Sequence, residues 1–234
     1  MSTEHTSKQF DAELEALRAR VLQMGGLVEE QIQLAVDALV TGDHDRCVAI
    51  EANDHRVNGM EVAIDEDCST IIARRQPAAG DLRMIMTVVK TITDLERIGD
   101  EAAKIARVAR VIGASDRLMQ PRFTEIKRMA ILATEMLRKA LDAFARLDVT
   151  ASAEVVRQDQ HVDEEFRGVI RQLITFMMED PRTISASIEI LFIAKAIERI
   201  GDHAKNISEY VIYMVKGKDV RHVSVEEIER EIGN

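Results

Sequence analysis

The sequence predicts an all-α fold made of two tandem, sequence-related three-helix bundles, with six long antiparallel helices. The 234 residues include only 3% aromatic side chains, 11 glycines and 3 prolines, a composition that favours long helices over a turn-rich β fold. Apolar residues recur at spacings of three and four along most of the chain, which is typical of amphipathic helices. The pentapeptide E-R-I-G-D occurs at residues 96–100 and again at 198–202, which indicates a duplicated unit.

The first repeat is expected to contain three helices. Its first helix is predicted over about residues 10–40, with a weak point at Gly25–Gly26, and its second over about 43–75, capped by Asp43. Pro77 suits the first turn of the third helix, which carries the first E-R-I-G-D and continues to about Ile112.

The second repeat is expected to contain the fourth to sixth helices, over about residues 121–147, 151–178 and 180–216, with Pro121 opening the fourth. The predicted segments are a flexible N-terminus (1–9), repeat 1 (10–113), a linker (114–121), repeat 2 (122–217) and a C-terminal tail (218–234). The tail is polar and is expected to be loosely held, with a short helix at Val225–Ile232. The two bundles are expected to be joined either lengthwise or side by side.

Each E-R-I-G-D motif places a Glu and an Asp four residues apart, on one face of its helix. The pairs Glu96/Asp100 and Glu198/Asp202 therefore suggest a site for a hard metal ion. In helical phase, Glu96 extends the apolar stripe of Ile85 and Ile92, so the acids should face a neighbouring helix. Two other interpretations stay open, namely a solvated acidic face and ion pairs with Arg97 and Arg199.

The neighbouring helices offer acids in the same phase. Five carboxylates are expected to join the motif acids: Asp54, Glu61 and Asp65 from the second helix, and Asp159 and Asp163 from the fifth. Oxygen ligands suit divalent or trivalent ions, and the identity stays open among Mg, Ca, Mn, Fe and Zn, although no paired His or Cys indicates a zinc site. His203 follows Asp202 but points about 100° away from it, so it is expected beside the site or on the surface.

Gly99 and Gly201 lie inside otherwise regular helices, where glycine costs about 1 kcal/mol relative to alanine. A close approach of helices, room for an ion beside the backbone, or a local packing need would each explain them.

Composition and motifs exclude several classes of function. The net charge of −10 disfavours nucleic acid as a partner. The two cysteines form no CxxC pair, which is typical of a reducing cytoplasm, and no stretch is long and apolar enough to span a membrane. The absence of an E-x-x-H motif disfavours a ferritin-like di-iron enzyme. No P-loop, nucleophile elbow or dinucleotide fingerprint occurs, so no catalysis is expected; a metal-storage or metal-dependent hydrolytic helical protein is the alternative.

Three stretches resemble the repeat signatures of the PhoU family, two in the first repeat and one in the second. These are R-Q-P-A-A-G-D-L-R (75–83) with T-D-L-E-R-I-G-D (93–100), and E-R-I-G-D-H-A-K-N-I (198–207). The resemblance covers about Phe10–Gly217 and implies tandem three-helix bundles, dimerisation, and metal bound by E(D)-x-x-x-D motifs. It assigns Glu96, Asp100, Glu198, Asp202, Asp159 and Asp163 as ligands. The corresponding pair on the second helix is Asp54 and Asn58, and because Asn58 is neutral, Glu61 and Asp65 are the substitutes. Arg97, Arg199, His203 and Asn206 are expected beside the ligands.

The resemblance also implies a function. Members of the family act in the cytoplasm with the ATPase subunit of the phosphate ABC transporter and with the phosphate sensor histidine kinase. They hold the phosphate-starvation response off when phosphate is plentiful, and they restrain phosphate uptake. The implied protein is a homodimeric, metal-binding adaptor that reaches the membrane only through its partners and binds no nucleic acid.

Overall fold

The computed structural model describes residues 8–114, 123–221, 223, 224, 226–228 and 230. The predicted N-terminus lies almost entirely outside these residues, as do Pro121 and most of the predicted linker. The described elements are α1 (Lys8–Thr41), α2 (His44–Arg75), α3 (Ala79–Ala114), α4 (Thr124–Arg146), α5 (Val149–Glu179), the short 3₁₀ helix η2 (Pro181–Thr183) and α6 (Ile184–Lys216). The all-α prediction is confirmed, and the described residues contain no strand.

Local chemistry explains where the helices begin and end. Asp43 caps α2 by accepting a hydrogen bond from the backbone N–H of Arg46 at 3.0 Å. Asp148 caps α5 in the same way, so this helix begins two residues earlier than the sequence indicated. Pro77 lies just before α3 instead of in its first turn, and Pro181 opens a 3₁₀ turn that leads into α6.

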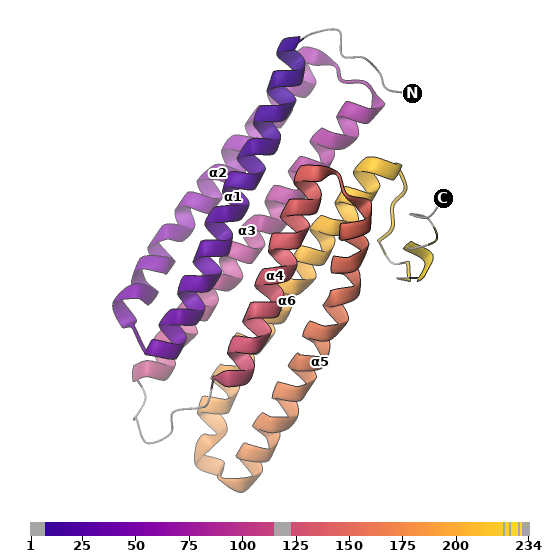
Figure 1. The fold of residues 1–234 in the computed structure, drawn as a ribbon. Helices are drawn as coiled ribbons and strands as arrows, with labels where there is room; N and C mark the ends of the chain where they lie inside the picture. Colours follow the sequence, from indigo (N-terminus) through magenta and orange to yellow (C-terminus); the bar gives the residue numbers. More distant parts are fainter. Residues whose placement is uncertain (1–7, 115–122, 222, 225, 229, 231–234) are drawn as a thin grey trace.

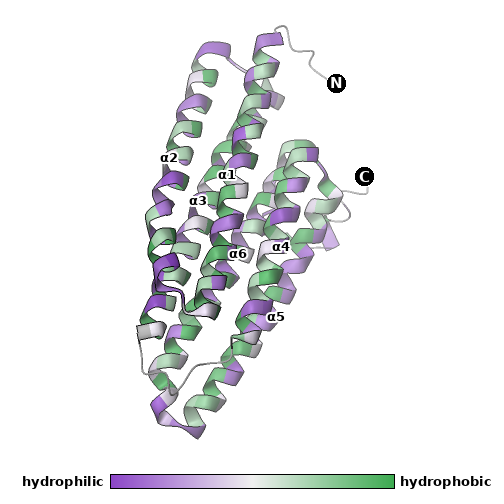
Figure 2. Cartoon of the chain, turned by 60° about the vertical axis from the view of Figure 1, so that its left-hand side comes forward, coloured by the Kyte–Doolittle hydropathy of each residue, from purple (hydrophilic) through white to green (hydrophobic). Residues whose placement is uncertain are grey.

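The two bundles lie side by side, displaced along their common direction (Figure 1). Helices α1–α3 form one bundle and α4–α6 the other, and the interface between them consists mainly of α3 against α6, with α1 against α4. A single hydrophobic core extends through both bundles, and the apolar faces of the helices turn toward each other (Figure 2). The two motif helices are therefore neighbours at the centre of the molecule.

Helix α1 runs without interruption through Gly25–Gly26, which the sequence marked as a weak point. A Cβ on Gly25 would lie only 2.6 Å from Cδ1 of Leu141 on α4. Glycine at this position lets the two bundles approach closely.

The segment after α6 differs from the loosely held tail that its polarity suggested. Val220 and Ile228 are almost completely buried, and they pack with Ala153, Val156 and Ile212 on the outer side of α5 and α6. Residues 226–228 are helical, whereas the rest of the helix expected at 225–232 is described only at residue 230. Burial of these two side chains holds the segment against repeat 2.

None of the described helices combines the length and the apolar character that a membrane crossing requires.

Candidate cation sites on the repeated motifs

The first carboxylate set consists of Glu96 and Asp100 from α3 with Asp54 and Glu61 from α2. Burial, and then the charges of Asp100, Glu61 and Asp54, raise the pKa of Glu96. Partial desolvation and the charges of Asp54 and Glu101 raise the pKa of Asp100, whose side chain is otherwise exposed. In the described chain no basic side chain forms a salt bridge with any of these four acids. The set therefore holds mutually repelling carboxylates that a cation would neutralise.

Asn58 and Gly99 lie on the helix faces that carry this set. The side-chain oxygen of Asn58 is buried and has no hydrogen-bond partner among the described residues. Because amide oxygens are ordinary ligands of hard cations, a neutral residue at this position is compatible with a cation site. A Cβ on Gly99 would lie 3.3 Å from Val57 and 3.5 Å from Oδ1 of Asp54, so this glycine allows a close approach of α3 to α2 beside a carboxylate. Gly201 has only ordinary contacts with Val162.

Asp65 is separated from the first set. Its side chain is exposed, and its charge acts on the thiol of Cys68 instead of on the motif acids. Of the three acids expected from α2, the structure therefore brings Asp54 and Glu61 to the motif and leaves Asp65 apart.

The second carboxylate set consists of Glu198 and Asp202 from α6 with Asp159 and Asp163 from α5. Burial, and then the charges of Glu198 and Asp159, raise the pKa of Asp202 to about 6, and Asp163 adds to the effect. The four acids predicted for repeat 2 therefore act on one another electrostatically, as the helical phase indicated.

Lysines neutralise part of the second set. Nζ of Lys195 lies 2.7 Å and 2.5 Å from the two carboxylate oxygens of Glu198. Nζ of Lys205 donates to Oδ2 of the buried Asp159 at 2.8 Å. Although burial opposes its charge, the hydrogen bond to Asp159 raises the pKa of Lys205. Sequence analysis missed both lysines, although each lies three residues from a motif acid.

The described His, Cys, Asp and Glu side chains include no group of three or more already arranged to hold a metal. The donor chemistry of the two sets nevertheless fits a hard cation, because the donors are carboxylate and amide oxygens and the pKa values of three of the acids are raised. Side-chain rotation would be needed to bring the oxygens of each set onto one ion.

His203 lies at the interface between the repeats. Its Nδ1 lies 2.6 Å from Oδ1 of Asp94 on α3, and both side chains are almost fully buried. Asn206 donates to the same Asp94 oxygen at 3.2 Å, and a hydrogen bond with Asp94 joins burial in raising the pKa of Tyr210. Sequence analysis placed His203 and Asn206 beside the ligands but missed Asp94, which precedes Glu96 by two positions.

Arg199 also connects the repeats. It forms an ion pair of 2.6 Å with the buried Glu101 on α3, and Lys104 approaches the same carboxylate at 3.4 Å. The ion-pair partner of Arg199 is therefore the residue that follows Asp100; among the described residues Arg199 forms no salt bridge with a motif acid, although its charge opposes the raised pKa of Asp100. Arg97 is exposed, and its charge opposes the raised pKa of Glu96.

A polar cavity of about 700 Å³ adjoins the second set, between α5, α6 and the segment after α6. Its walls include Asp159, Asp202, His203 and Lys205, and Arg221 contributes from the C-terminal side. A cation or a small polar molecule could therefore reach the second set from this side.

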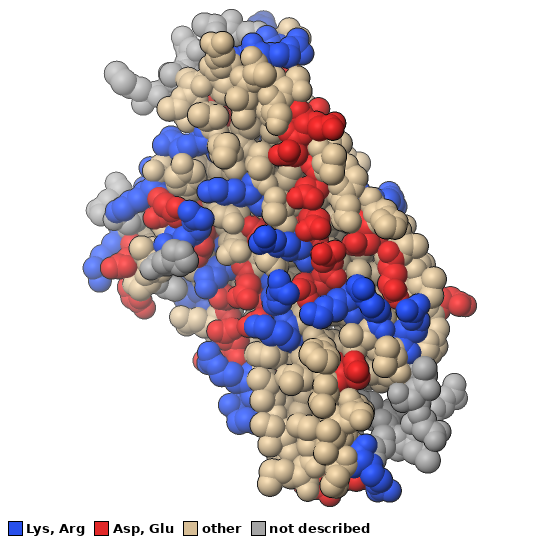
Figure 3. Space-filling view, turned by 180° about the vertical axis from the view of Figure 1, so that it is seen from behind, with Lys and Arg blue, Asp and Glu red and all other residues tan. Residues whose placement is uncertain are grey.

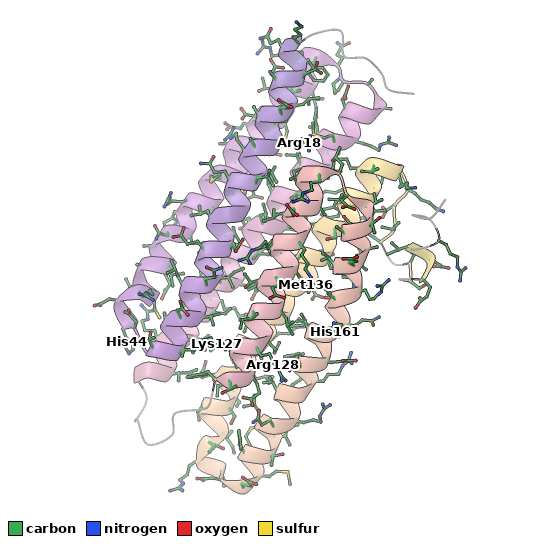
Figure 4. All side chains as sticks on the ribbon, viewed as in Figure 1. Arg18, His44, Lys127, Arg128, Met136 and His161 are labelled. Atoms are coloured by element: carbon green, nitrogen blue, oxygen red, sulfur yellow. The ribbon has the colours of Figure 1, made fainter. Side chains whose placement is uncertain are left out.

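Other residues capable of binding a metal are scattered. His44 lies at one end of α2 and His161 is exposed on α5, in different bundles (Figure 4). Cys47 and Cys68 are free thiols, and burial raises the pKa of both.

One broad face of the molecule shows acidic and basic side chains interleaved in a band across its middle (Figure 3). This mixture does not form the basic surface that nucleic acids require.

The fold and the repeated acids define a class of protein, a tandem three-helix-bundle protein with one carboxylate set in each repeat. A family model described as the PhoU domain matches the chain twice, over residues 21–109 and 126–211. The chain belongs to the PhoU family.

Named relatives and solved structures agree with this assignment. The chain is 46% identical over 226 residues to the phosphate-specific transport system accessory protein PhoU of Escherichia coli K12, an alignment that covers 97% of this chain and 93% of that one. The Pseudomonas aeruginosa homologue is 46% identical over 99% of this chain and 96% of its own length. The crystal structure of PhoU from Pseudomonas aeruginosa matches with a TM-score of 0.85 over 89% of this chain and 100% of that one. PhoU from Streptococcus pneumoniae, at 28% identity, gives a TM-score of 0.84 over 90% of this chain and 99% of that one.

Proposed function

We propose that this protein is the accessory protein of a phosphate-specific transport system and a negative regulator of phosphate-starvation signalling. The observation that supports this most strongly is the 46% identity to the Escherichia coli accessory protein along almost the whole length of both chains. In this proposal the protein acts on the cytoplasmic side of the membrane as an adaptor without catalytic activity. Its partners are the ATPase subunit of the phosphate ABC transporter and the phosphate sensor histidine kinase, and it acts as a homodimer.

In this proposal, the carboxylate sets bind cations that hold neighbouring helices of each bundle together. Each set joins acids from two helices of one bundle, α2 with α3 and α5 with α6, so a cation in each set would fix the two helices relative to each other. The raised pKa values of Glu96, Asp100 and Asp202 support this role, because they reflect burial of the carboxylates and then repulsion between them, both of which a bound cation would offset. Fixed helices would present a preorganised surface to the partners and so reduce the entropic cost of binding them.

A genetic experiment tests the regulatory role. The gene is deleted in the source bacterium, and a phosphate-starvation reporter is followed in phosphate-rich medium. We expect the reporter to become active and a plasmid copy of the gene to silence it again. A reporter that stays silent in the deletion strain would exclude a negative regulator.

The deletion strain also tests whether regulation depends on the carboxylates of the two sets. A plasmid copy carrying Glu96→Gln, Asp100→Asn, Glu198→Gln and Asp202→Asn should fail to silence the reporter although it accumulates to the wild-type level. Exposed Asp65, changed to Asn, is the matched control and should behave as wild type. Purified protein should show neither ferroxidase nor phosphatase activity, and either activity would favour the storage or hydrolytic alternative.

A further inference from the structure

The two repeats neutralise their carboxylates differently. Positions in the motif helices α3 and α6 correspond at an interval of 102 residues, which relates Glu96 to Glu198. Lys195 and Lys205 of repeat 2 therefore correspond to Thr93 and Ala103 of repeat 1, neither of which can carry a positive charge. The lysines pair with Glu198 and Asp159, whereas no described basic side chain forms a salt bridge with any acid of the first set.

We propose that Lys195 and Lys205 are tethered counter-ions of the second carboxylate set, and that a divalent cation must displace them in order to bind there. Among the described residues, arginines act on the first set only through their charge, and no ammonium or guanidinium group is in salt-bridge contact with its carboxylates. The two repeats are therefore unequal cation sites: the first binds a cation more tightly, and the second responds only at higher cation concentration. This inference rests on the proposed role of the carboxylate sets as cation sites.

The geometry of the two ammonium groups supports displacement. Lys195 contacts both oxygens of Glu198, and Lys205 contacts Oδ2 of Asp159, so each lysine occupies carboxylate lone pairs that a cation would need. Both lysine side chains are about one-third to one-half exposed, at 47% and 34%, whereas their acidic partners are nearly buried. The ammonium groups can therefore move into water while the acids remain in place.

His203 gives an independent indication that the second set takes a ligand. Only 6% of this residue is exposed, its Nδ1 is held by Asp94, and its Nε2 has no hydrogen-bond partner among the described residues. The same side chain lines the cavity that also contains Asp159, Asp202 and Lys205. In the tautomer whose Nδ1–H donates to Asp94, Nε2 presents a lone pair, which suits a cation or its bound water.

The test is a titration of the full-length protein with Mn²⁺, using paramagnetic resonance to count free ions. Glu96→Gln with Asp100→Asn leaves only the second set, and Glu198→Gln with Asp202→Asn leaves only the first. We expect the first set to bind Mn²⁺ about tenfold more tightly than the second, because displacing the two lysine ion pairs costs about 1.4 kcal/mol together, which corresponds to a tenfold change in affinity.

Replacing the lysines gives the decisive comparison. In the variant that retains only the second set, Lys195→Met and Lys205→Met together should raise the affinity for Mn²⁺ by about tenfold or more. The same change in the variant that retains only the first set should leave its affinity unchanged. Lys139→Met, which removes an exposed lysine of α4, controls for the change in net charge. An unchanged or lower affinity of the second set would overturn the inference.

A second measurement needs no substitution and so does not depend on the folding of Lys205→Met, which leaves Asp159 buried without its lysine partner. Amine-reactive labelling of the wild-type protein, read by mass spectrometry, should show that Mn²⁺ increases the labelling of Lys195 and Lys205 relative to Lys139. Bound Mn²⁺ without any increase would contradict displacement of the lysines. A wild-type protein that binds no Mn²⁺ in either assay would instead contradict the proposed cation sites themselves.

Discussion

Oδ1 of Asp94 on α3 lies 2.6 Å from Nδ1 of His203 on α6, and both side chains are almost fully buried at the interface of the two repeats. Each residue is close in sequence to a motif acid: Asp94 precedes Glu96 by two positions, and His203 follows Asp202 directly. A polar contact at the centre of the molecule therefore fixes the register of the two motif helices. The contact has no counterpart in the other repeat, because the position in α6 that corresponds to Asp94 is Ala196.

The first prediction concerns this contact. His203→Ala removes the main partner of a buried carboxylate, so the free energy of unfolding should fall by about 2–4 kcal/mol. Urea denaturation in the presence of a chelator measures the change without any contribution from bound metal. In a double-mutant cycle with Asp94→Asn, the coupling energy should be about 1 kcal/mol or more. Additive effects of the two substitutions would show that the contact contributes nothing.

The second prediction concerns pH. Burial raises the pKa of Glu209 from 4.5 to about 7. The negative charges of Asp159 and Asp219 add to this rise, and the positive charges of Lys205 and Arg221 oppose it. Below about pH 4.5 both the folded and the unfolded state hold this proton. As the pH rises to 7, the unfolded state loses it first, so this group lowers stability progressively, and above pH 7 its cost is constant.

Glu209→Gln should therefore flatten the decline in melting temperature between pH 4.5 and 7, with little effect at pH 4. Thermal unfolding of chelator-treated protein across this range gives the measurement. Glu189→Gln, on the same helix but away from the polar cavity, is the control. A decline of equal slope in the Glu209 variant and the wild type would contradict the prediction.

The third prediction concerns the segment after α6. Ile228 is completely buried, so Ile228→Ala should weaken docking of this segment by about 2–4 kcal/mol. Hydrogen exchange should then increase at Val220–Ile228 and leave the central helices protected. Val223→Ala, at a residue that is 41% exposed, is the matched control and should change little. Rapid exchange of this segment in the wild-type protein would show that the burial of Val220 and Ile228 does not hold it.

The fourth prediction concerns Asn58. Because its side-chain oxygen is buried, has no hydrogen-bond partner in the described part of the chain and is in phase with Asp54, Asn58→Asp should add a ligand charge to the first set. We expect the affinity of that set for Mn²⁺ to rise by about tenfold, and Asn58→Leu to lower it. Asp65→Asn should leave it unchanged, since Asp65 lies apart from the motif acids. Equal affinities in the Asn58 variants would place Asn58 outside the site.

The fold could be predicted from the sequence because its determinants are local and repeated. Three-and-four spacing of apolar residues marked each helix, Asp43 marked a cap, and the two E-R-I-G-D motifs marked the duplication. Helical phase also brought Asp54 and Glu61 to the motif of α3, because residues that share an apolar stripe face the same neighbour.

The contacts between repeats could not be predicted in the same way. Periodicity shows which face of a helix is buried, but it does not show which distant helix lies against that face. Asp94 could be paired with His203 only after α3 and α6 were placed side by side, and the same is true of Glu101 with Arg199. The burial of Ile228 was missed for a related reason, since the few apolar residues of this polar segment do not show which distant helices they pack against.

The central claim is that the repeated acids bind cations, and metal content tests it most directly. The wild-type protein, the Glu96→Gln/Asp100→Asn variant and the Glu198→Gln/Asp202→Asn variant are loaded with Mn²⁺, dialysed and measured by elemental analysis. The proposed sites predict bound metal in the wild type, a reduced content in each variant and none when the four substitutions are combined. Equal and near-zero metal in all four proteins would contradict the claim and leave the acids a purely electrostatic role in a helical scaffold.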